Sequence, residues 1–130
     1  MIVADTDVLI DFLSGHEPVA SLVASGIAAE EGMVTTVVSR FELLAGARSA
    51  KQERAVRKLL EALLTLDLDS RAADRAARVR RDLEKAGASI GMADSLIAGM
   101  VLEHSGRLLT RNRRHFERVE GLRLVPVKHR

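Results

Sequence analysis

This chain of 130 residues contains no cysteine, no tryptophan and no tyrosine. Without cysteine there is no disulfide framework, no thiol nucleophile and no cysteine-ligated zinc site. Aromatic residues make up only 2% of the chain, which argues against recognition of single-stranded bases by stacking. Any contact with nucleic acid is therefore expected to be directed at phosphates.

Long apolar runs are also missing, since none approaches the roughly 18 residues of a membrane span. A predicted strand begins at Ile2, which leaves no room for a signal peptide ahead of it. We therefore expect a cytoplasmic protein with no membrane partner. At this length we expect a single domain over residues 1–130 that folds without a metal or a disulfide.

The net charge of +2 hides a strong separation of charge along the chain. Residues 1–47 carry seven acids and one base, whereas residues 107–130 carry eight bases and two acids. Such a separation is typical of a metal-binding acid cluster beside a surface that attracts anions. It is equally typical of ordinary solvated helix faces, so charge alone does not assign a function.

Short β-branched runs alternate with longer segments of helical periodicity. Strands are expected at 2–5, 33–35, 107–110 and 122–127, and 65–68 is either an edge strand or a connector. Helices are expected from Thr6, from Pro18, over 36–48, 51–64 and 70–85, and from about 92 to Gly106, with 112–118 as a polar loop or short helix. This alternation indicates an α/β fold with a parallel sheet covered by helices on both faces.

Three acids occupy positions that solvation does not explain. Asp5 follows the first strand, Asp94 begins a strongly apolar helix, and Glu42 borders an apolar stripe that we assign to Val37, Val38, Phe41, Leu44 and Ala45. Because ligands of open α/β sheets bind at the carboxyl ends of the strands, the three carboxylates are expected to converge there. Each also has a structural explanation: Asp5 as a helix cap, Asp94 as a partner of the helix dipole, and Glu42 as a partner of Arg40 or Arg48.

Converging carboxylates need a counter-charge. Two of them about 5 Å apart repel by roughly 3 kcal/mol at an effective dielectric constant near 20, so such a cluster must take up protons or a cation. Oxygen ligands without cysteine favour Mg²⁺ or Mn²⁺ over zinc. Asp7 is a further candidate ligand, although Asp7 and Asp11 lie one helical turn apart and would also fit a solvent-exposed face. The histidines are scattered and expected at the surface: His16, His104, His115 and His129.

Four segments, in this order and spacing, resemble the motifs of PIN-domain ribonucleases, and among them the VapC-type toxins of type II toxin–antitoxin pairs. They are DTDVLID from Asp5, TTVVSRFELLAG from Thr35, IGMADSLIA from Ile90, and LLTRNRRHF from Leu108 followed by VEGL from Val119. The resemblance implies a three-layer α/β/α PIN-like domain with a central, mostly parallel twisted sheet of four or five strands. It also implies that Asp5, Glu42 and Asp94 are the catalytic metal ligands.

The same resemblance implies a function. By this resemblance we expect a metal-dependent endoribonuclease that uses Mg²⁺ or Mn²⁺ to cleave RNA phosphodiester bonds. We also expect it to act as a toxin, to form a homodimer and to be neutralised by a cognate antitoxin. The side chains expected to orient water or phosphate are Thr6, Thr110 and Asn112, and those expected to attract RNA are Arg111, Arg113 and Arg114. Many relatives have a fourth acid where this chain has Asn112, so a second ion would bind weakly or only together with substrate phosphate.

Two other functions fit part of the pattern. A haloacid dehalogenase-like phosphatase would use Asp5 as a covalent nucleophile and Asp7 as acid and base, but it also needs a lysine and a late acid pair, for which the chain offers only Asp94 and Glu103. The missing fourth acid also permits a catalytically silent PIN-like binding module.

Overall fold

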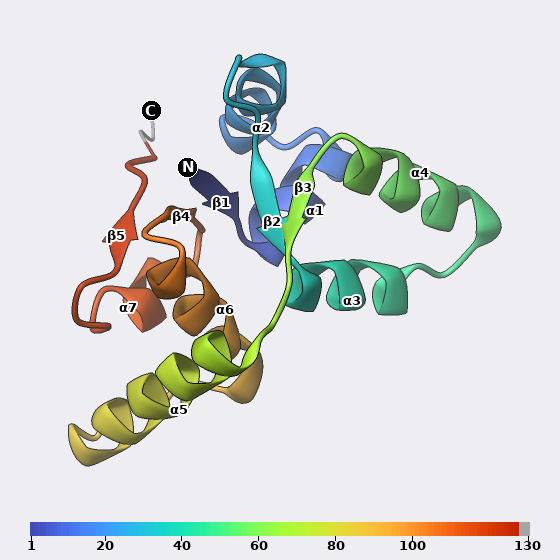
Figure 1. The fold of residues 1–130 in the computed structure, drawn as a ribbon. Coiled ribbons are helices and arrows are strands. Elements are labelled where there is room, and N and C mark those ends of the chain that lie inside the picture. Colours follow the sequence, from blue (N-terminus) through green and yellow to red (C-terminus); the bar gives the residue numbers. More distant parts are fainter. Residues whose placement is uncertain (128–130) are drawn as a thin grey trace.

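The computed structural model describes residues 1–127. Five parallel strands form one sheet in the order β3-β2-β1-β4-β5 (Figure 1). They are β1 (Ile2–Ala4), β2 (Val34–Thr36), β3 (Leu64–Leu66), β4 (Arg107–Leu109) and β5 (Arg123–Leu124). The predicted α/β fold with a parallel sheet is confirmed, and the segment near residue 65 is an edge strand.

Seven helices connect and cover these strands. They are α1 (Thr6–Ser14), α2 (Val19–Ala28), α3 (Val37–Gly46), α4 (Ala50–Glu61), α5 (Ser70–Lys85), α6 (Met92–Glu103) and the short α7 (Arg113–Phe116). The expected helix over 70–85 has the predicted bounds, whereas the fourth helix ends earlier because residues 64–66 pair with β2. Among residues 1–127, no helix combines the length and apolar composition needed to cross a bilayer.

Two apolar clusters lie on opposite faces of the sheet. Consecutive strand residues point to opposite faces, and accordingly Val3 and Leu108 belong to one cluster, whereas Ala4 and Leu109 belong to the other. Helices α1, α2 and α4 contribute to the cluster around Ala4, and α5 and α6 contribute to the cluster around Val3. The expected three layers are therefore present, and the sheet is the middle one.

The predicted apolar face of α3 is wrong in part. Phe41 was assigned to the buried stripe but is 70% exposed, and Ala45 is also exposed. The side chains that α3 buries are Ser39 and Leu43, one turn apart. Ser39 faces inward because it bonds to Thr6 and to Thr36, so the inner face of this helix is partly polar. A prediction from hydrophobic periodicity therefore assigns the wrong residues to the buried face of this helix.

Two expectations extend beyond the described residues. The surface position of His129 lies outside residues 1–127, and the prediction of one domain over residues 1–130 stays a prediction.

Glycine 99 fixes how closely α5 and α6 pack. A Cβ atom at Gly99 would lie 2.6 Å from the carbonyl oxygen of Ala72 and 2.6 Å from the backbone nitrogen of Ala76. Because both neighbours are backbone atoms, they cannot move aside without shifting α5 as a whole. The absence of a side chain at Gly99 thus sets the distance between these helices.

We expect the substitution Gly99→Ala to lower the free energy of unfolding by roughly 1–3 kcal/mol, as overpacking of a core does. The control is Gly46→Ala at the end of α3, where a Cβ atom would meet nothing within 4 Å. The control should stay within about 1 kcal/mol of wild type, because alanine is the better helix former. Urea denaturation of both variants measures the difference, and equal stability of the two would contradict this account of the packing.

Candidate active site

Asp5 lies where β1 ends and α1 begins, at the carboxyl edge of the sheet. Its side chain is 5% exposed. Oδ1 accepts a hydrogen bond from the backbone nitrogen of Thr6 (2.8 Å), and Oδ2 accepts one from the hydroxyl of Thr110 (2.7 Å), which follows β4. Burial, then the charge of Asp7 and a smaller contribution from Asp94, raise the pKa of Asp5 to about 6. Asp5 is therefore a helix cap and, at the same time, a carboxylate that burial makes hard to ionise.

Asp7, two residues further along α1, is incompletely paired. Its Oδ2 atom accepts a hydrogen bond from the backbone nitrogen of Arg111 (3.0 Å) and lies 3.4 Å from the Thr110 hydroxyl. A hydroxyl has one proton to donate, and the shorter distance directs that of Thr110 to Asp5. The other oxygen of Asp7, Oδ1, is buried and has no hydrogen-bond partner within residues 1–127. Burial raises the pKa of Asp7 above its usual value.

Glu42 reaches this edge from α3. Its Oε1 atom accepts a hydrogen bond from the Thr6 hydroxyl (2.7 Å), and that hydroxyl also lies 2.8 Å from Ser39 Oγ. Since a charged acceptor takes the single proton of Thr6, the Ser39 hydroxyl donates to Thr6. In the described part of the chain, Glu42 forms no ion pair with Arg40 or Arg48, so the structural explanation proposed for it has no support.

Asp94 lies in the first turn of α6, where the helix dipole favours an acid. Its Oδ2 atom is 3.3 Å from Asn112 Nδ2 and 3.1 Å from His115 Nδ1, and these two nitrogen atoms are 2.8 Å apart. The Nδ1 atom can donate to Asp94 when it carries a proton, or accept from the Asn112 amide when it does not. His115 is thus part of the site, which the sequence did not predict.

These contacts bring Asp5, Asp7, Glu42 and Asp94 to one edge of the sheet. Thr6 connects Asp5 with Glu42, and Thr110 lies between Asp5 and Asp7. Within the residues that the structure describes, no group of three or more acidic or histidine side chains is close enough to hold a metal ion. Each carboxylate is instead held by a hydroxyl, amide or imidazole group: Thr6 and Thr110 for Asp5, Thr110 and Arg111 for Asp7, Thr6 for Glu42, and Asn112 and His115 for Asp94.

The donor set nevertheless fits a hard divalent cation. The side chains supply carboxylate oxygens, which Mg²⁺ and Mn²⁺ prefer. The unpaired Oδ1 atom of Asp7 and the raised pKa of Asp5 both mark a deficit of positive charge. A cation would correct this deficit, and a proton would correct only part of it.

The expectation that Asp11 lies on a solvent-exposed face is wrong. Its side chain is 8% exposed and pairs with the guanidinium of Arg111 (2.8 Å) and with His16 (3.6 Å). Arg113 is also engaged within the fold, since its Nη1 atom donates to the carbonyl of Val125 (3.0 Å). Arg114 is exposed and has no ion pair or hydrogen bond to the described residues.

The chain is similar to known proteins in both sequence and structure. A family model described as PIN domain matches residues 2–122. The chain is 32% identical over 95 residues to the tRNA(fMet)-specific endonuclease VapC of Shigella flexneri. The matched segment covers 70% of this chain and 72% of that relative.

Two solved structures are similar over nearly the whole chain. DNA-bound VapBC from Salmonella typhimurium has a TM-score of 0.81 and 26% identity, and covers 95% of this chain and 96% of the other. A toxin–antitoxin complex from Klebsiella pneumoniae has a TM-score of 0.78 and 22% identity, and covers 94% and 95%.

We expect the metal-free protein to lose stability as the pH rises through about 6. Asp5 keeps its proton up to about pH 6 when folded, but only to about 3.8 when unfolded, so the folded state binds more protons between these values. Asp5→Asn should remove the contribution of Asp5 to this pH dependence and raise the free energy of unfolding at pH 7.5 by about 1–3 kcal/mol, given about 1.4 kcal/mol per pKa unit less the weakened hydrogen bonds.

Denaturation in chelator from pH 5 to pH 7.5 measures this effect. Asp67→Asn is the control, because Asp67 is an exposed carboxyl between β3 and α5. The control should keep the wild-type pH dependence. An Asp5→Asn variant that is less stable than wild type at pH 7.5 would contradict the view that ionised Asp5 is destabilising.

Proposed function

This chain belongs to the PIN domain family, and on that premise we propose that it is a metal-dependent endoribonuclease that acts as the toxin of a toxin–antitoxin pair. The observation that carries the proposal is the edge of the sheet that gathers Asp5, Asp7, Glu42 and Asp94 and leaves a buried oxygen of Asp7 unpaired. The similarity to a VapC endonuclease supports the reaction class.

Asp5, Glu42 and Asp94, with Asp7 as a fourth candidate, are the residues that would hold Mg²⁺ or Mn²⁺. Such an ion supplies Lewis-acid polarisation of a phosphoryl oxygen and lowers the pKa of water. Asn112 stands where many relatives have an acid and adds no negative charge, so the proposal requires one ion and not two.

The neighbouring residues hold the carboxylates in place for this task. The Thr110 hydroxyl fixes Oδ2 of Asp5, and the Thr6 hydroxyl fixes Oε1 of Glu42. Asn112 and His115 together hold Oδ2 of Asp94. Thr6, Thr110 and Asn112 are neutral donors, so they hold the carboxylates without a positive charge that would compete with a cation.

The substrate and partners follow from the relatives. We infer that the substrate is RNA, because a relative is named for cleavage of a tRNA, and that an antitoxin neutralises the chain, because similar solved structures are toxin–antitoxin complexes. We also propose a homodimer and a cytoplasmic site of action, where such a substrate occurs.

The phosphatase alternative has no supporting observation. A haloacid dehalogenase-like enzyme needs a lysine at its phosphate, and the lysines among residues 1–127 are exposed on α4 and α5: Lys51, Lys58 and Lys85. None of them has a hydrogen bond or ion pair with Asp5 or Asp7 in this part of the chain. The family match further favours the nuclease.

Replacing Asp5 or Asp94 by asparagine should reduce RNA cleavage by more than about 100-fold, beyond the loss usual for residues that only support metal ligands. The fold should persist, because neither substitution adds volume or a buried charge. Cleavage of tRNA with Mg²⁺ or Mn²⁺ is measured alongside circular dichroism. Asp74→Asn on α5 is the control, and full activity of the Asp5 and Asp94 variants would end the proposal.

Calorimetric titration with Mn²⁺ tests the metal directly. Wild type should bind one ion per chain, and Asp5→Asn should lose detectable binding, because the carboxylate charge provides the affinity for a hard cation. Glu61→Gln, at the end of α4, should bind as wild type does. If wild type bound no Mn²⁺, or bound it as well as Asp5→Asn does, the result would instead favour the catalytically silent module.

A further inference from the structure

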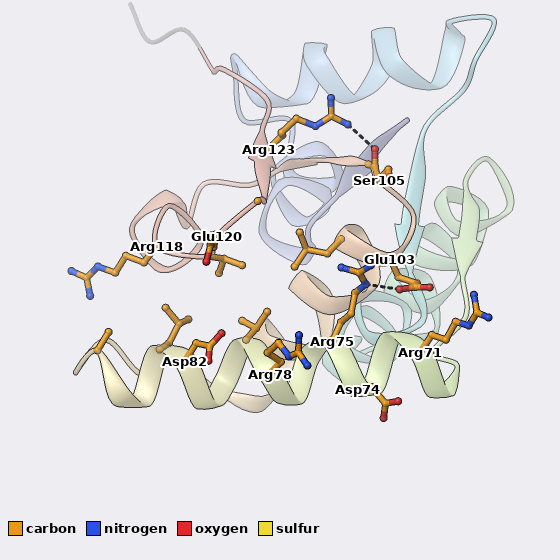
Figure 2. A pocket seen from close by; sticks show the side chains of 17 residues that line it. Arg71, Asp74, Arg75, Arg78, Asp82, Glu103, Ser105, Arg118, Glu120 and Arg123 are labelled. Carbon is orange, nitrogen blue, oxygen red and sulfur yellow. Dashed lines mark hydrogen bonds and ion pairs between the residues drawn. The ribbon is translucent and has the colours of Figure 1, made fainter.

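Two hollows lie beside α5, and they differ in charge. The larger has a volume of about 980 Å³ and runs along α5 beside the end of α6 and residues 118–123 (Figure 2). The smaller, about 280 Å³, is lined by residues 87–90 on one side and by Arg114, His115 and Arg118, in and just after α7, on the other. Arg118 lines both, and in Figure 2 it projects near the C-terminal end of α5.

The larger cleft does not suit a polyanion. Its lining includes five arginines but also four carboxylates, those of Asp74, Asp82, Glu103 and Glu120. Two of the arginines are already engaged, because Arg75 pairs with Glu103 and Arg123 donates to the carbonyl of Ser105. Little uncompensated positive charge remains along this surface, and it contains none of the site acids.

The smaller pocket carries no carboxylate at all. It is lined by Gly87, Ala88, Ser89, Ile90, Arg114, His115 and Arg118. Neither Arg114 nor Arg118 forms an ion pair or hydrogen bond with any of residues 1–127, in contrast to Arg111 and Arg113, whose guanidinium groups bind Asp11 and Val125. Gly87 has a φ of 70°, which turns the chain after α5 back toward α7. Two free guanidinium groups thus share one basic hollow.

This pocket opens directly beside the candidate active site. His115 lines the pocket, and its Nδ1 atom lies 3.1 Å from Asp94 Oδ2. His115 thus joins the site to the pocket, so a nucleic acid strand that continued from Asp94 past His115 would bring a further phosphate to the pocket of Arg114 and Arg118. Guanidinium groups bind phosphate through paired hydrogen bonds, which suits this position.

We propose that residues 87–90, Arg114 and Arg118 form a flanking-phosphate pocket that binds a backbone phosphate of the RNA next to the one that is cleaved. The proposal rests on the proposed nuclease function and specifies which arginines serve it. Arg111 and Arg113 maintain the fold, whereas Arg114 and Arg118 hold the substrate. An acidic segment of a protein partner is the competing occupant.

The test is the double variant Arg114→Ala/Arg118→Ala in the full chain. Binding of a fluorescent single-stranded RNA is followed by anisotropy in chelator, where no cleavage occurs, between about 50 and 200 mM salt. We expect affinity to fall about tenfold and the slope of log K against log salt to decrease by about 0.7 for each lost phosphate contact. With metal, KM should rise while kcat stays near wild type, because the pocket does not touch the reacting phosphate.

The control is Arg54→Ala/Arg57→Ala, which removes the same charge from the exposed face of α4. Equal losses in both double variants would mean that net charge alone attracts RNA, which overturns the pocket. Unchanged RNA affinity of the Arg114 and Arg118 variant, with reduced binding of a polyglutamate peptide, would assign the pocket to an acidic protein segment and overturn the proposal as well.

Failure of the pocket can be told apart from failure of the nuclease function. A wild type that neither binds nor cleaves RNA refutes the nuclease function itself. A wild type that cleaves RNA, together with a double variant of unchanged KM, refutes the pocket alone.

Discussion

Several carboxylates, one of them buried and the others half-buried, meet at one edge of the sheet, and the rest of the molecule depends on this constraint. Asp5 at the end of β1 is buried and Asp7 is half-buried; burial raises the pKa of both, and the charge of Asp7 raises that of Asp5 further. The neighbouring groups that hold these carboxylates are hydrogen-bond donors: the hydroxyls of Thr6 and Thr110 and the backbone amide of Arg111. The guanidinium of Arg111 pairs with Asp11 (2.8 Å), and its charge also offsets part of the rise in the pKa of Asp7 that burial causes. These donors are compatible with a folded protein, but within residues 1–127 they leave the buried Oδ1 atom of Asp7 without a hydrogen-bond partner.

The position of the candidate site could be predicted from the sequence, because all strands of a parallel sheet end at the same edge. A strand that runs into Asp5 and another that runs into Thr110 must end at the same edge, whatever the details of packing. The structural explanation of Asp5 as a cap was also correct, and it does not compete with a functional one. A cap uses one carboxylate oxygen, and Asp5 gives its other oxygen to Thr110.

Other features were beyond sequence reasoning for physical reasons. The buried face of α3 includes Ser39, so the search for an apolar stripe selected Phe41, which is exposed. The burial of Asp11 depends on Arg111, a partner one hundred positions away that no local pattern reveals. His115 gave no signal because a single histidine has no periodicity, and only its distance to Asp94 identifies it. Long-range pairing of polar groups, and not hydrophobic burial, accounts for each of these differences.

The hydrogen bond between Thr110 and Asp5 spans 105 positions of sequence, and this separation has a consequence for biosynthesis. Strand β1 leaves the ribosome first, but its neighbour β4 and the loop that carries Thr110, Arg111 and Asn112 are translated more than one hundred residues later. Contacts of such high sequence separation form late in folding. A nascent chain that stops short of β4 therefore presents Asp5 and Asp7 without the partners that position them, so the site can assemble only after residues 107–112 have been made.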